Sequence, residues 1–223
     1  MLLGHRCVGA VELDPHCRKV LEARQRDGIL PPFPILDDVR AFDGRPWRGK
    51  VDVVCGGFPC QPWSAAGKRL GAADPRHLWP EMARIVDEVR PRYVFAENVS
   101  LAAFAEPWRD LRGMGYRVPP ALRLGPSDLG GSQSRDRWWL LASMPDNHAE
   151  RVEPVDAEAC RPLEDALSGW EAATWWGDGG ISACADGIPH RMGGSRSLGN
   201  AQVPAVAASA FSELMRLHYQ QPA

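Results

Sequence analysis

A short apolar run that ends in a glycine turn constrains the fold more than any other feature of this 223-residue chain. Residues 51–54 lead into a Cys-Gly-Gly-Phe segment, which is followed by Pro59 and Cys60. The continuous apolar residues 53–55 are typical of a strand that is covered on both faces in a parallel sheet. The two glycines allow a sharp turn, and Pro59 stiffens the backbone before the thiol. Open α/β sheets bind ligands at the carboxyl ends of their strands, so Cys60 is a candidate nucleophile.

A cysteine taken alone is more often a small buried hydrophobic residue than a catalyst, and the surrounding motifs decide between the two interpretations. Four motifs occur in order: Pro59-Cys60-Gln61, Glu97-Asn98-Val99, Gln133-Ser134-Arg135-Asp136-Arg137 and Gly199-Asn200-Ala201-Gln202-Val203. In this order they resemble the DNA (cytosine-5) methyltransferase family, whose motifs are Pro-Cys-Gln, Glu-Asn-Val, Gln-x-Arg-x-Arg and Gly-Asn-x-x-Val. The resemblance runs from about residue 3 to residue 211 and is poor between residues 144 and 185. The approach to the last motif, residues 186–191, resembles that of short phage-type members.

The resemblance implies methyl transfer from S-adenosylmethionine to carbon-5 of cytosine. Carbon-5 is a weak nucleophile until a thiolate adds to carbon-6, and Cys60 would supply that thiolate. Glu97 would hydrogen-bond the N3 and amine edge of the base and stabilise its protonated form. Arg137 would reach the O2 atom of the base, and Arg135 would brace the loop that carries the thiol. The target base must be flipped out of the duplex to meet these groups.

The partners of Cys60 also have structural interpretations. Glu97 ends a predicted strand and could cap the following turn. Arg135 and Arg137 alternate on a strand-like segment and could be solvated edge residues. Two arginines beside a cysteine and an acid are better explained as a clamp for an anion or a base.

The segment after the thiol, residues 62–76, is rich in glycine, alanine and proline and carries three basic residues. This composition suits a lid that closes over DNA and contacts its phosphates, although an ordinary surface loop would look similar. Its position directly after the thiol favours the lid. The residues expected to contact double-stranded DNA are Gln61, Ser64, Lys68, Arg69, Arg76 and Gln133.

Acids that follow strands indicate a nucleotide site in the first 40 residues. Residues 7–14 are predicted to form a strand that ends in an acid, a helix is predicted over 15–26, and a further acid follows residues 34–36. The resemblance assigns Glu12 to the ribose hydroxyls, Leu13 to the adenine face, and Asp38 with Val39 to the adenine amine edge. A second helix is predicted over 77–90, where apolar residues recur at helical spacing. The remaining residues that the resemblance places against the cofactor are Pro59, Leu78, Asn200 and Val203.

The chain departs from the family at its start. Members begin with a strand and a Phe-x-Gly-x-Gly loop, whereas this sequence opens at a position near the end of the helix that follows that loop. The predicted fold is therefore an α/β, Rossmann-like S-adenosylmethionine-dependent methyltransferase sheet that is truncated at its N-terminus. The missing strand belongs at the centre of the sheet, so we expect unpaired backbone edges on both of its neighbours. A late start codon, a truncated gene or a second chain that supplies the segment would each explain this.

Composition agrees with one α/β domain and a small appendage. We expect residues 1–143, completed by 197–219, to form the catalytic domain, and residues 144–196 to form a reduced target-recognition region or a linker. The formal charge of −2 argues against nonspecific binding to nucleic acid but allows a local basic cleft. The six cysteines form no Cys-x-x-Cys pair, so no metal site is predicted. No signal peptide or transmembrane run is present, so a cytoplasmic protein is expected.

The sequence thus predicts a DNA (cytosine-5)-methyltransferase of the kind found in restriction-modification systems. The alternative is an inactive remnant, or one half of a split enzyme, that binds DNA or a partner without catalysis. The lost glycine loop is the reason for keeping this alternative.

Overall fold

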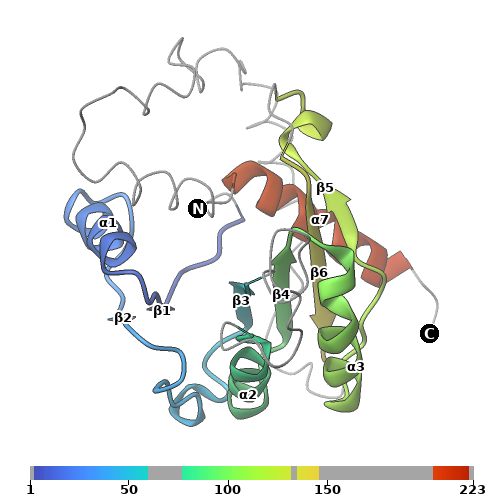
Figure 1. The fold of residues 1–223 in the computed structure, drawn as a ribbon, viewed down its shortest axis with the longest axis horizontal. Helices are drawn as coiled ribbons and strands as arrows, with labels where there is room; N and C mark the ends of the chain where they lie inside the picture. Colours follow the sequence, from blue (N-terminus) through green and yellow to red (C-terminus); the bar gives the residue numbers. More distant parts are fainter. Residues whose placement is uncertain (1–2, 60–76, 132–134, 146–202, 221–223) are drawn as a thin grey trace.

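The computed structural model describes residues 3–59, 77–131, 135–145 and 203–220, which form two sheets and their covering helices (Figure 1). Within this part of the chain, no helix combines the length and the apolar composition needed to cross a membrane. The described residues include short 3-10 turns at Arg45–Trp47, Leu101–Phe104 and Pro126–Leu129. The strands and α-helices are β1 (Ala10–Val11), α1 (Pro15–Arg26), β2 (Ile35–Leu36), β3 (Val53–Gly57), α2 (Trp79–Val89), β4 (Tyr93–Asn98), α3 (Ala105–Gly113), β5 (Leu122–Leu124), β6 (Arg137–Ser143) and α7 (Pro204–Gln220).

The larger sheet has the strand order β3-β4-β6-β5. Strands β3 and β4 are parallel, whereas β6 runs antiparallel to both β4 and β5. Helices α2 and α3 cover one face of this sheet and α7 covers the other (Figure 1). Side chains alternate between the two faces along each strand. On β4, Val94 and Ala96 pack toward α2 and α3, whereas Tyr93 and Phe95 pack toward α7.

The two predicted helices are confirmed. Helix α1 spans the predicted residues 15–26, and α2 occupies most of the predicted 77–90. Trp79 begins α2, and Pro80 lies in its first turn, where a missing N–H costs nothing. Arg90 caps the end of the helix in a left-handed conformation. The buried residues of α2 lie at helical spacing and form its core-facing side: Trp79, Met82, Ala83, Ile85, Val86 and Val89.

The strand before the glycine turn is not covered on both faces, which corrects the expectation from its apolar sequence. Val53 and Val54 are half-buried, and Cys55 is exposed. The physical reason is position, because among the described strands β3 lies at the edge of the larger sheet and pairs only with β4. The strand predicted within residues 7–14 is also shorter than expected and includes only Ala10 and Val11.

The described strands form two separate sheets. Among the described strands, β1 pairs only with β2, in parallel, and the outer edge of β3 has no strand beside it. The two-stranded unit stands apart from β3 in Figure 1. The α1 helix between β1 and β2 has no buried residue. The described part of the chain is therefore an α/β fold with a two-stranded parallel sheet and a four-stranded mixed sheet.

Polar contacts to α2 hold the segment between the two-stranded unit and β3. Arg84 donates from Nη2 to the Val39 carbonyl and from Nη1 to the Phe42 carbonyl, both at 2.9 Å. The Gly44 amide donates to Glu88 Oε2 at 2.7 Å. A Cβ at Gly44 would lie 2.9 Å from a methyl group of Val89, so only glycine allows this close approach to α2.

Candidate functional site

A buried ion pair lies at the carboxyl end of β4. Arg137 Nε and Glu97 Oε1 are 2.9 Å apart, and their side chains are only 16% and 13% exposed. Glu97 is the register partner of Trp139 on β6, so Arg137 reaches it diagonally from two residues away. Arg137 also donates from Nη1 to the Asp136 carbonyl at 2.8 Å. These contacts fix the carboxylate and the guanidinium against each other.

Arg135, the other arginine of the same motif, lies next to this pair. Burial and the neighbouring charge of Arg137 lower the pKa of Arg135, and the charge of Glu97 partly opposes them. Arg135 and Arg137 line a small hollow together with Trp139 and Val203. Val203 comes from the last predicted motif, so the fold brings together residues more than 60 positions apart in the sequence.

Asn98 connects the end of β4 to the segment that precedes Cys60. Its side chain is 1% exposed, and Nδ2 donates to the Phe58 carbonyl at 3.0 Å. Its Oδ1 accepts a hydrogen bond from the Ser100 amide at 3.2 Å. Asn98 was not among the predicted site residues, although its place beside Glu97 in the Glu-Asn-Val motif could have indicated this role. It positions the backbone two residues before the thiol.

An aromatic cluster packs around Phe58 in the same turn. Phe58 makes edge-to-face contacts with Trp79 and Phe104, with ring centroids 5.5 and 5.8 Å apart. Trp79 is fully buried and donates from Nε1 to Asp110 Oδ2 at 2.9 Å. Such pairs add about 0.5–1.5 kcal/mol each beyond the area they bury. The turn before Cys60 is therefore held in place by packing of Phe58 against buried aromatic side chains.

The predicted cofactor residues of the two-stranded unit lie at the carboxyl ends of β1 and β2. Glu12 directly follows β1 and accepts a hydrogen bond from the Asp14 amide at 2.8 Å. Asp38 lies two positions after the end of β2, and its carboxylate accepts a hydrogen bond from the Arg40 amide at 2.9 Å. Because the two strands are parallel, both carboxylates lie at the same edge of their sheet. Leu13 beside them is 59% exposed.

Further apolar side chains, which were not among the predicted site residues, are exposed where strands end. Leu36 ends β2, and Val99 and Leu101 follow β4; their exposed fractions are 36%, 43% and 50%. Leu36 belongs to the two-stranded sheet, whereas Val99 and Leu101 follow a strand of the larger one, and single exposed apolar side chains are normal on any surface. Carboxylates beside exposed apolar side chains fit a nucleoside, which has hydroxyl groups and a flat aromatic base.

The other predicted residues divide into two groups. Pro59 and Val39 are half-buried, and Leu78 immediately precedes α2. The residues that lie outside the described part of the chain are Cys60, Gln61, Ser64, Lys68, Arg69, Arg76, Gln133 and Asn200. Residues 146–196, which are most of the predicted recognition region 144–196, also lie outside it.

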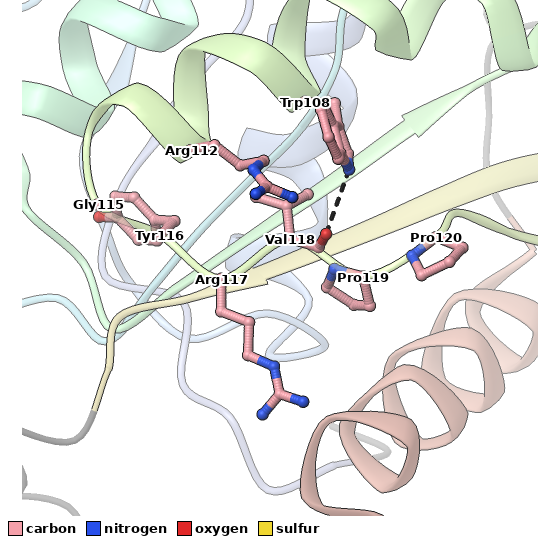
Figure 2. A pocket seen from close by; sticks show the side chains of 8 residues that line it. All are labelled: Trp108, Arg112, Gly115, Tyr116, Arg117, Val118, Pro119 and Pro120. Carbon is pink, nitrogen blue, oxygen red and sulfur yellow. Dashed lines mark hydrogen bonds between the residues drawn. The ribbon is translucent and has the colours of Figure 1, made fainter. Parts of the chain in front are cut away.

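A pocket of about 480 Å³ lies elsewhere, between α3 and the segment that leads into β5 (Figure 2). Trp108 donates from Nε1 to the Val118 carbonyl at 3.2 Å, and the Arg112 guanidinium lies 4.4 Å from the centre of the indole. Arg117 points away from this pair in Figure 2. None of the predicted site residues lines this pocket, so the candidate site depends on the geometry around Glu97 instead.

Comparisons with known proteins agree with the motifs. The family model described as C-5 cytosine-specific DNA methylase matches residues 2–169. The type II methyltransferase M.NaeI of Lentzea aerocolonigenes is 35% identical over 92% of this chain, and M.HpaII of Haemophilus parainfluenzae is 32% identical over 69% of it. The chain spans about half the length of these curated relatives, 51% and 45% respectively. The fold is similar to that of the S. pombe Dnmt2 methyltransferase, with a TM-score of 0.50 at 20% identity over 69% of this chain and 50% of that one.

Proposed function

This chain belongs to the C-5 cytosine-specific DNA methylase family, and we propose that it transfers a methyl group to carbon-5 of a cytosine flipped out of double-stranded DNA. The observation that carries the proposal is the buried Glu97–Arg137 pair. It lies at the carboxyl end of β4, beside the turn that leads to Cys60, and open sheets bind their ligands at this edge.

Each residue of the pair has a role that follows from its chemistry. Glu97 hydrogen-bonds the N3 and amine edge of the flipped cytosine and stabilises positive charge on the ring. Arg137 holds that carboxylate and donates to the O2 atom of the base. The Cys60 thiolate adds to carbon-6, and loss of the carbon-5 proton after methylation expels the thiolate again. Arg135 braces the loop that carries the thiol.

S-adenosylmethionine would supply the methyl group as a sulfonium. Glu12 and Asp38 would accept hydrogen bonds from ribose and adenine, and the position of both carboxylates at the carboxyl edge of the two-stranded sheet supports this role. Exposed Leu13 offers an apolar surface to the adenine ring. The remaining residues proposed to contact this cofactor are Val39, Pro59, Leu78, Asn200 and Val203.

We further propose that residues 1–143, with 197–219, form the catalytic domain and that 144–196 form a reduced recognition region or linker. The proposed DNA contacts are Gln61, Ser64, Lys68, Arg69, Arg76 and Gln133. A cytoplasmic location stays a prediction from the sequence.

The test is transfer of labelled methyl groups from S-adenosylmethionine to DNA by the purified chain, with Cys60→Ser as the matched variant. We expect transfer that the variant lacks. DNA that contains 5-fluorocytosine should also form a covalent adduct with the chain and none with the variant. Equal transfer by both proteins would contradict the covalent mechanism.

A second candidate, one half of a split enzyme or a remnant without catalysis, is favoured by the division of the sheet. The outer edge of β3 lacks a neighbouring strand among the described residues, and unpaired edges of this kind accept a strand from elsewhere. A chain that transfers no methyl group alone, but does so when a polypeptide carrying a strand and a Phe-x-Gly-x-Gly loop is added, would support the split enzyme. Transfer by the chain alone would exclude this candidate.

A further inference from the structure

Glycine at position 57 leaves space that the carboxylate of Glu97 occupies. A Cβ atom built on Gly57 would lie 2.9 Å from Glu97 Oε2, a separation that real Cβ atoms essentially never show. The two residues are register partners on the neighbouring parallel strands β3 and β4. Register partners project their side chains from the same face of a sheet, so a side chain at position 57 would meet the carboxylate directly.

The carboxylate is also held from its other side. Glu97 Oε1 lies 2.9 Å from Arg137 Nε, and Arg137 belongs to β6, which is the other neighbour of β4. Glu97 is therefore fixed between Gly57 on β3 and Arg137 on β6, with one oxygen toward each. A glutamate side chain is flexible enough to move away from a methyl group at position 57. That movement would break the geometry with Arg137 while costing the fold little.

The preceding glycine provides a contrast within the same strand. A Cβ on Gly56 would contact only the sulfur and terminal methyl of Met82, at 3.5 and 3.7 Å, which are ordinary van der Waals distances. Met82 lies on α2, so Gly56 faces the opposite side of the sheet from Gly57. Neither glycine has the positive φ that disfavours alanine. The difference between the two positions is thus the Glu97 carboxylate.

We propose that Gly57 is a positioning residue, whose missing side chain lets the Glu97 carboxylate sit where it can hold both Arg137 and the base. Its role in base recognition rests on the proposed function of Glu97. Gly57 itself touches no reacting atom.

The first test needs no turnover. The Arg137 Nε–H resonance is measured by NMR in the full chain, in Gly57→Ala and in Gly56→Ala. Glu97→Gln serves to identify this resonance and shows how far it moves when the carboxylate is lost. We expect Gly57→Ala to shift or broaden this resonance, Gly56→Ala to leave it in place, and both alanine variants to unfold at nearly the same denaturant concentration. An unmoved resonance in Gly57→Ala, or an equal shift in both variants, would overturn the proposal.

The second test measures methyl transfer. Gly57→Ala should lower kcat by at least about tenfold with little change in the KM for DNA, because displacing a catalytic group by about 1 Å costs on the order of a hundredfold. Gly56→Ala should stay within about twofold of the starting protein. In a Glu97→Gln background, Gly57→Ala should have no further effect, and a full additional loss would refute action through the carboxylate. A wild-type chain without any transfer would contradict the proposed function, while the NMR comparison would still decide the role of Gly57.

Discussion

Replacement of Asn98 tests the connection between β4 and the thiol turn. Asn98→Ala removes the donor to the Phe58 carbonyl and the acceptor for the Ser100 amide. A buried carbonyl left without a partner costs about 1–3 kcal/mol, and the lost second bond costs about 1 kcal/mol. We therefore expect the free energy of unfolding to fall by about 2–4 kcal/mol, a large part of the 5–15 kcal/mol typical of a domain.

The assay is urea unfolding followed by tryptophan fluorescence, with Trp79 close to the altered site. For a slope of about 2–3 kcal/mol per molar urea, the midpoint should fall by on the order of 1 M. Ser100→Ala is the matched control, because it retains the Ser100 amide that bonds to Asn98. This control should leave the midpoint nearly unchanged.

Asn98→Asp tests the assigned direction of the hydrogen bond. The introduced carboxylate keeps the shape of the side chain but places an acceptor against the Phe58 carbonyl in a buried site. Burial should raise its pKa above the unfolded value, so this variant should be destabilised at neutral pH and should regain stability as the pH falls. A variant as stable as the starting protein at pH 7 would refute donation from Asn98 to Phe58.

Three further predictions concern buried polar groups. Glu97→Gln should lower the free energy of unfolding in urea by about 2–3 kcal/mol, because it leaves the Arg137 guanidinium buried beside a neutral amide. Adding Arg137→Met should restore most of this stability, and a larger loss in the double variant would contradict this reasoning. Burial lowers the pKa of His218, so the folded protein favours the neutral imidazole. The stability that this imidazole contributes is present above its unfolded pKa of about 6.5 and is lost as the pH falls toward its folded pKa. Unfolding measured between about pH 7.5 and pH 5.5 should show this decline, and His218→Gln should flatten the curve. Trp79→Phe should lower the free energy of unfolding by about 1–2 kcal/mol, because it removes the hydrogen bond to Asp110. Asp110→Asn retains an acceptor and should cost less. A phenylalanine variant as stable as the starting protein would mean that this hydrogen bond contributes nothing.

The sequence predicted the elements that depend on local patterns. Helical spacing of apolar residues predicted α2, and the strand with its terminal acid predicted β4 and the place of Glu97 at its carboxyl end. These predictions succeeded because the period of the apolar residues and the order of the motifs are properties of the chain itself.

Only the tertiary structure decided how distant residues meet. It showed that Arg137 pairs diagonally with Glu97, that Asn98 bonds to the Phe58 carbonyl, and that Gly57 leaves space for a carboxylate. It also showed that Cys55, within an apolar run that predicted a covered strand, is exposed. Such contacts depend on strand order, register and the side of the sheet to which each residue points. A shift of one residue in register would reverse every one of these faces, so no local pattern in the sequence could determine them.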